Sequence, residues 1–245
     1  MEIEPERILI ATQGPNKEPY KSEIVFLFKS LNSYGGRLAN SQKVACFDEK
    51  PDSILVEKLE SLGVRIKIVE NIDERSPNSN KIQMLSLNKS EDFDVLVALD
   101  SDIVAVNDFI KYIDQEKFSA KPVDQDPFSM ENWKTIFDYF GLKIPQERHL
   151  TSFYKSETIS YFNSGVLVIP QKYLSSLYDS WKDFVRKLLN SYDDMPEIKK
   201  NSFFTDQIAL SLALASLKIP INPLPVEMNF PTNYKMVHLY LHSLL

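Results

Sequence analysis

Two aspartates, Asp100 and Asp102, stand one residue apart between two apolar segments. The segment before them, Val95 to Leu99, contains no polar residue, which predicts a strand buried on both faces, as in a parallel sheet covered by helices. In such sheets ligands bind beyond the carboxyl ends of the strands. The pair therefore stands where an α/β protein is expected to bind its ligand.

Two carboxylates about 5 Å apart repel each other by roughly 3 kcal/mol at an effective dielectric constant near 20. A shared proton, a basic side chain or a hard divalent cation relieves such repulsion. No lysine or arginine lies between Asp94 and Ile110, so we expect Mn²⁺ or Mg²⁺, which usually also binds substrate phosphates. The alternative is that Asp100 starts a turn and Asp102 is solvated, because isolated Asp-x-Asp tripeptides are common.

The composition is that of a soluble globular protein, with 245 residues, 43% hydrophobic and 25% charged. The net charge of −6 argues against nucleic acid as a partner. The single cysteine, Cys46, lies in an apolar stretch, which excludes a disulfide framework and fits a reducing compartment. An acidic start and the lack of a membrane-spanning apolar run favour a cytoplasmic protein. A peripheral membrane contact and the oligomeric state stay open.

Apolar runs and helix-like patterns alternate in the first hundred residues, which predicts a parallel sheet flanked by helices. Strands are expected at 8–12, 43–47, 64–69 and 95–99, with helices beginning near Ser22, Asp52 and Asn80. The carboxyl ends of these strands would bring Thr12, Gln13 and the loop after Phe47 to the edge that carries the aspartates.

The second part of the chain is less regular. We expect strands at 118–123, 166–169 and 236–241, and helices at 109–113, 131–142, 173–189 and 208–217. Segment 191–202 is expected to be a loop, and 220–231 to be extended. Helix capping alone would explain Asp206. Two interpretations of segment 147–156 remain open. It could be a lid or a surface for the second substrate, or it could be a solvated loop without a function in binding.

Three motifs follow in order, namely VALDSDIV, YFNSGVLVIP and FTDQIALSLAL. Together they resemble the nucleotide-sugar-dependent glycosyltransferases of the type A fold, in particular the glycogenin and lipopolysaccharide galactosyltransferase group. The resemblance extends from the first strand to about Phe230. It implies a single domain over 1–245 with a Rossmann-like, mostly parallel central sheet, in which 1–106 form the nucleotide-binding half and 107–245 the acceptor- and sugar-binding half.

The same resemblance implies a divalent ion, Mn²⁺ or Mg²⁺, that joins the chain to the donor diphosphate. Asp100 and Asp102 would hold this ion, and a late histidine, His238 or His242, would complete its shell. The implied contacts of the donor nucleotide are Ala11, Thr12, Gln13, Lys81, Asp100 and Ser101.

Three further residues are implied at the transferred sugar. Asn163 would lie under it, and Asp206 and Gln207 would contact its hydroxyls or its reacting face. The donor would be a UDP-sugar, and the acceptor would be a hydroxyl of a glycan, a lipid-linked molecule or a protein. The transfer would retain the configuration at the anomeric carbon. The group's late His-x-x-Gly-x-x-Lys-Pro-Trp pattern is absent from this sequence.

Three other functions are weighed against this one. A sugar-phosphate nucleotidyltransferase needs a glycine-rich basic loop for a triphosphate, whereas residues 13–17 offer one glycine and one lysine. A non-catalytic nucleotide-sugar-binding protein is disfavoured by the intact aspartate pair. A calcium-binding domain would need six to eight oxygen ligands, and only two acids cluster here.

Overall fold

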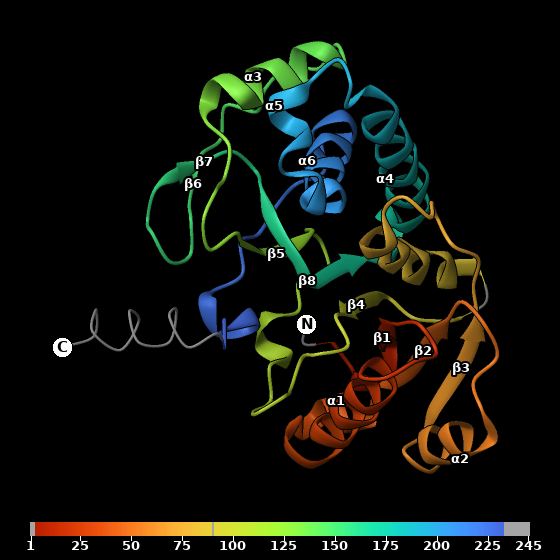
Figure 1. Ribbon diagram of the computed structural model, residues 1–245. Coiled ribbons are helices and arrows are strands. Elements are labelled where there is room, and N and C mark those ends of the chain that lie inside the picture. Colours follow the sequence, from red (N-terminus) through yellow and green to blue (C-terminus); the bar gives the residue numbers. More distant parts are fainter. Residues whose placement is uncertain (1–2, 90, 233–245) are drawn as a thin grey trace.

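The computed structural model describes residues 3–89 and 91–232, so the strand expected at 236–241 and both candidate ligands, His238 and His242, lie outside the described residues. A six-stranded sheet in the order β3-β2-β1-β4-β8-β5 forms the centre of the molecule (Figure 1). Its strands are β1 (Ile8–Gln13), β2 (Gln42–Phe47), β3 (Val64–Ile68), β4 (Val95–Leu99), β5 (Ser119–Pro122) and β8 (Phe162–Pro170).

The direction of the strands brings two of the sequence motifs together. β1 is parallel to β2 and β4, and β2 is parallel to β3, whereas β8 is antiparallel to both of its neighbours, β4 and β5. The expected mostly parallel sheet is therefore confirmed, with β8 reversed within it. Because β8 is reversed, its beginning lies beside the end of β4, where Leu99 pairs with Val166.

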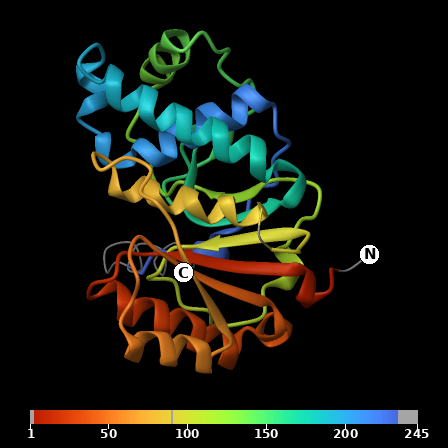
Figure 2. The same ribbon diagram turned by 90° about the vertical axis from the view of Figure 1, so that its right-hand side faces the viewer.

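Helices cover both faces of the sheet (Figure 2). One face packs against α1 (Tyr20–Tyr34) and α2 (Ser53–Ser61), and the other against η3 (Pro77–Lys89), α4 (Gln171–Ser191) and α6 (Thr205–Leu217). The remaining elements are η1 (Pro5–Arg7), η2 (Gly36–Asn40), η4 (Ile110–Tyr112), α3 (Met130–Tyr139), β6 (His149–Leu150), β7 (Glu157–Thr158), α5 (Pro196–Lys199), η5 (Ser202–Phe204) and η6 (Val226–Asn229). None of the described helices is both long and apolar enough to cross a bilayer.

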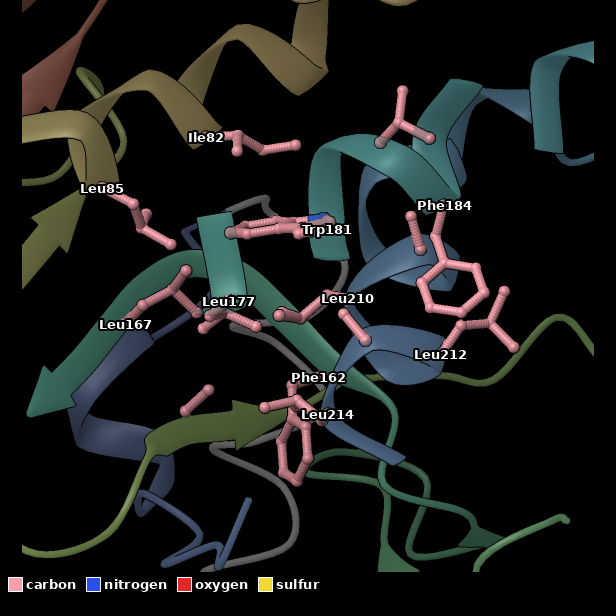
Figure 3. Close-up of a cluster of buried hydrophobic side chains, with 14 of the residues drawn as sticks. Ile82, Leu85, Phe162, Leu167, Leu177, Trp181, Phe184, Leu210, Leu212 and Leu214 are labelled. Atoms are coloured by element: carbon pink, nitrogen blue, oxygen red, sulfur yellow. The ribbon is translucent and has the colours of Figure 1, made fainter. Parts of the chain in front are cut away.

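Alternate residues of the strands enter two separate hydrophobic layers, as expected for a sheet buried on both faces. Leu9 and Ala11 face the layer under α4 and α6, whereas Ile8 and Ile10 face α1. Trp181 of α4 is fully buried in the first layer, near Leu177, Leu210 and Ile82 (Figure 3). This layer fixes η3 and α6 against the sheet, and these elements carry two of the functional side chains.

Several local expectations differ from the structure, and residues 226–229 of the segment expected to be extended form the 3₁₀ helix η6. Residues 77–89 form 3₁₀ turns rather than an α-helix, and side chains such as Asn80, which accepts from the backbone N–H of Ile72, bond the neighbouring loop. The expected loop 191–202 contains the short helix α5, which begins with a proline, a residue favoured at the first helical position. Segment 147–156 pairs as β6 with β7, and the N–H of Ser152 bonds Val123, so this excursion is docked on the domain.

Candidate active site

A cleft of about 640 Å³ opens at the carboxyl edge of the sheet, between the ends of β1, β2 and β4 and the start of η3. Its lining includes Asp100, Ser101 and Asp102 after β4, Gln13 of β1 and Asp48 after β2. Clefts of this size accept small-molecule ligands, and they occur at this edge in open α/β sheets. The cleft therefore lies where the sequence predicts the site.

The turn that follows β4 presents the aspartate pair to this cleft. The backbone N–H of Asp100 donates to the carbonyl of Gly165 at 2.8 Å, which extends the β4–β8 pairing by one residue. Ser101 is buried, and its hydroxyl donates to Glu23 of α1 at 2.9 Å. Partial removal from water and the charges of Asp100 and Glu23 raise the pKa of Asp102 above its ordinary value. The turn thus concentrates negative charge at the cleft.

Lys81 of η3 joins the three sequence motifs. Its Nζ lies 2.6 Å from Oδ1 of Asp100 and 3.9 Å from Oδ2 of Asp206, and it donates to the hydroxyl of Ser164 at 3.2 Å. Burial alone would lower the pKa of Lys81, but Asp100, Asp206 and Asp102 outweigh burial and raise it. Lys81 is therefore charged at neutral pH.

The sequence around the aspartate pair contains no base, yet Lys81 compensates part of its charge from a different element. Repulsion between Asp100 and Asp102 is thus not by itself an argument for a metal ion.

Asp206 lies behind Lys81 rather than in the cleft. It is 2% exposed, and Oδ2 accepts from the hydroxyl of Ser164 at 2.6 Å. Burial raises its pKa, opposed by Lys81 and Ser164. Its side chain does not cap α6, because the N-cap is Phe204 and has no side-chain hydrogen bond. The carbonyl of Asp206 accepts from Nε1 of Trp181 at 2.8 Å, which anchors the first turn of α6.

The start of β8 is packed tightly against the aspartate turn. Oδ1 of Asn163 accepts from the N–H of Gly165 at 2.8 Å and from Nδ2 of Asn229 at 3.0 Å. A Cβ atom at Gly165 would lie 3.0 Å from Oδ2 of Asp100 and from Nδ2 of Asn229. Any larger residue here would displace the ends of Asp100, Asn163 and Asn229, so this close approach favours glycine.

The residues expected beside the nucleoside are placed at different depths. Ala11 and Thr12 are fully buried in β1, whereas Gln13 lines the cleft. Among the other sugar candidates, Gln207 is half-buried in the first turn of α6. The structure therefore brings Gln13, Lys81 and the aspartate turn to one cleft, with Ala11, Thr12 and Asp206 buried next to it.

Several residues of the cleft, among them Asp48 and Glu23, were missed by reasoning from the sequence. Asp48 follows β2, in the loop after Phe47 that was expected at this edge, so its position was an available signal. Glu23 lies on α1 and gave no signal, because one acid on an amphipathic helix is ordinarily a solvated residue.

The charge of the cleft bears on its ligand. Its lining contains five carboxylates and two lysines, a net charge of −3, from Glu23, Asp48, Glu74, Asp100, Asp102, Lys17 and Lys81. Within residues 3–89 and 91–232, no three His, Cys, Asp or Glu side chains are grouped as a complete metal site. Mg²⁺ keeps several waters and needs one or two carboxylates beside substrate phosphates. Asp100 and Asp102 fit a hard cation that is bound together with an anionic ligand.

Residues 15–218 match the model of a protein family described as the Rhodobacterales glycosyltransferase domain. No curated protein matches this chain. Among solved structures, the glycosyltransferase GlyE of Streptococcus pneumoniae TIGR4 is similar at 16% identity and a TM-score of 0.56, over 96% of this chain and 49% of that one. The present chain thus spans about half the length of GlyE.

Two further structures show the same fold. The apo form of GlyE from the same organism is 16% identical, with a TM-score of 0.55, over 96% of this chain and 50% of that one. Mouse xyloside xylosyltransferase 1, also in its apo form, is 11% identical, with a TM-score of 0.54, over 89% of this chain and 84% of that one. At these identities the similarity is one of fold.

Proposed function

The chain belongs to the Rhodobacterales glycosyltransferase domain family, and from this premise we propose that it transfers a sugar from a UDP-sugar to an acceptor hydroxyl, with a divalent ion and with retention. The observation that carries the proposal is the cluster around Lys81, which joins Asp100, Ser164 and Asp206 beside the cleft. Asp100, Ser164 and Asp206 each come from a different one of the three sequence motifs, and Lys81 brings them together.

The proposed reaction breaks the bond between the anomeric carbon and a diphosphate oxygen, and forms one between that carbon and the acceptor oxygen. The acceptor proton passes to the departing diphosphate, which leaves as the nucleoside diphosphate. Negative charge grows on the diphosphate, and a charged group already in place lowers the barrier without reorganising. Lys81, held by Asp100 and Asp206, is such a group.

A divalent ion is supported by the charge of the cleft. An anionic diphosphate entering a cleft of net charge −3 is repelled unless cations accompany it. Asp100 and Asp102 would hold Mn²⁺ or Mg²⁺, which when bound acts as a Lewis acid on the diphosphate.

The position of Asp206 argues against its being the catalytic base of an inverting transfer. An inverting enzyme needs a carboxylate base near the acceptor hydroxyl. Asp206 is instead buried against Ser164 and behind Lys81, where it positions these side chains. A retaining transfer in which the leaving diphosphate takes the acceptor proton needs no such base.

The acceptor stays a proposal of class only, a hydroxyl of a glycan, a lipid-linked molecule or a protein. A cytoplasmic location likewise stays a prediction, which cell fractionation would test.

Release of free UDP tests the proposal. The purified protein is incubated with UDP-glucose, UDP-galactose and UDP-xylose, with Mn²⁺ or with a chelator, and free UDP and the thermal midpoint are measured. We expect UDP release from at least one donor, lost on chelation and in Asp102→Asn. The control is Asp179→Asn, which removes an exposed carboxylate of α4 outside the cleft. Metal-dependent donor binding without UDP release would identify a non-catalytic binding protein instead.

A further inference from the structure

The two aspartates of the turn after β4 are held in different ways. Lys81 forms an ion pair with Asp100, whereas no ion pair among the described residues reaches Asp102, which is exposed at the cleft. The N–H of Ile103 donates to the carbonyl of Asp100 at 3.3 Å, which is long for the hydrogen bond of a β-turn. Ser101 and Asp102 are the central residues of this turn. The turn by itself therefore gives Asp102 little support.

Support for the turn comes from α1. The hydroxyl of Ser101, which is buried, donates to Oε2 of Glu23 at 2.9 Å. Glu23 lies in the first turn of α1 and lines the cleft together with the aspartates. Because Ser101 stands between Asp100 and Asp102, a hydrogen bond that fixes its side chain also limits the rotation of the main chain on both sides. Glu23 thus acts on the direction of Asp102 through Ser101.

The same helix holds the segment after the turn at a second point. The N–H of Ala105 donates to the hydroxyl of Ser30, a buried residue of α1, at 2.9 Å. Glu23 and Ser30 are seven residues apart, so they stand on one face of α1 and are separated by about 10 Å along its axis. The four residues from Ser101 to Ala105 can span up to about 13 Å, which is enough to follow α1 between these points. Asp102 is therefore enclosed between two hydrogen bonds to one rigid element.

A carboxylate is a demanding choice for the acceptor at Ser101. Glu23 adds a third negative charge near Asp100 and Asp102, which repel it. A neutral oxygen would satisfy the hydroxyl without this repulsion. A hydrogen bond from a hydroxyl to a carboxylate is, however, about twice as strong as one to a neutral acceptor. The glutamate therefore favours a firmly held turn over one of low charge.

We propose that Glu23 is a positioning residue of the transfer, which through Ser101 holds Asp102 where it would bind the divalent ion. The proposal rests on the proposed function, because the ion and the donor diphosphate belong to that function. Loss of a hydrogen-bonding group behind metal ligands typically lowers metal affinity or activity by about tenfold to hundredfold. Glu23 needs no contact with the donor to have such an effect.

Four variants test this inference, namely Glu23→Ala, Ser101→Ala, their double variant and Glu23→Gln. Binding of Mn²⁺ in the presence of UDP is followed by the electron paramagnetic resonance signal of free Mn²⁺, and UDP release is measured in parallel. Glu23→Ala and Ser101→Ala should each weaken Mn²⁺ binding at least about tenfold and slow UDP release about tenfold to hundredfold. The double variant should match the single ones within about twofold, because all three lack the same hydrogen bond. Glu23→Gln keeps an acceptor and should come within about threefold of the wild type.

The control is Glu57→Ala, which removes an exposed carboxylate of α2 outside the cleft and should behave as the wild type. A thermal melt of each variant without ligand verifies folding, and Ser101→Ala tests the same hydrogen bond if Glu23→Ala does not fold.

Three results overturn the inference alone. One is Mn²⁺ binding by Glu23→Ala as tight as in the wild type. Another is an additive loss in the double variant, which would give Glu23 and Ser101 separate roles. The third is a loss in Glu23→Gln as large as in Glu23→Ala, which would assign the effect to charge rather than to the hydrogen bond. A wild type that neither binds Mn²⁺ with UDP nor releases UDP overturns the proposed function, and the inference with it.

Discussion

The ends of β4 and β2 are two parts of one cleft that differ in how their polar groups are satisfied. At the end of β4, Asp100 is paired with Lys81, and Asn163 accepts two hydrogen bonds. At the end of β2, Asp48 and Asn16 each bury an acceptor with no partner in the described residues. The first end is ordered by contacts within the chain, whereas the second leaves two buried oxygens without a hydrogen-bond partner among the described residues. Fixed charges are what electrostatic stabilisation of a transition state needs.

Removal of the lysine should have the largest effect on the ordered end. In Lys81→Met, Asp100 and Asp206 lose their shared cation, so UDP release should fall about 1,000-fold. Because the variant leaves two carboxylates without a positively charged partner, the free energy of unfolding measured in urea should fall by about 3 kcal/mol. The double variant Lys81→Met/Asp206→Asn should regain part of this stability but no activity. Recovery of activity together with stability would assign Lys81 a structural role only.

Asp206→Asn should lower turnover about tenfold to hundredfold while the dissociation constant of UDP changes less than about twofold. The reason is that Asp206 is buried behind Lys81 and acts on its position rather than on the donor. Steady-state kinetics and titration with UDP measure the two quantities separately. An equal loss in both would show that Asp206 contributes to ground-state binding.

Gly165→Ala tests how closely the ordered end is packed. The added methyl group would force Asp100 and Asn229 to shift by a few tenths of an ångström, so turnover should fall about tenfold. The thermal midpoint should change little, because the displaced atoms are ends of side chains. Full activity in this variant would show that the position of Asp100 is not critical.

The smallest effect is a pH-dependent change in stability at Asp102. A carboxyl group whose pKa is raised by folding favours the folded state at low pH, and this advantage is lost as the pH rises through the raised value. Without metal, Asp102→Asn should therefore raise the thermal midpoint at pH 7 by about 1–2 °C, and this gain should vanish near pH 3. With Mn²⁺ and UDP the order should reverse, because only the wild type is stabilised by binding. A variant less stable than the wild type at pH 7 without ligand would contradict the expectation.

Much of the sheet was predictable because its strands are long apolar runs. The run Val95 to Leu99 coincides with β4, and the aspartates after it reach the expected cleft. The antiparallel direction of β8 was not predictable, because a strand buried on both faces has the same apolar sequence pattern whether it is parallel or antiparallel to its neighbours.

The contacts that the site residues make were harder to predict than which residues belong to the site. Lys81 belongs to a segment of 3₁₀ turns whose helical spacing suggested an α-helix, and its ion pairs depend on how that segment docks. The burial of Asp206 follows from packing of Trp181 on α6, which no local pattern encodes. The depth of Ala11 and Thr12 likewise depends on the strands that flank β1.

The reversed strand separates the register of the site from the length of the segment between β5 and β8. Main-chain hydrogen bonds between β4 and β8 hold Asp100 beside Gly165 whatever lies between β5 and β8. The aromatic side chains of that excursion, Phe128, Trp133 and Tyr161, contact one another within the hydrophobic layer under α4 and α6. A change in the length of that excursion therefore leaves the pairing at Asp100 in register, provided that these aromatic contacts with the common core are kept.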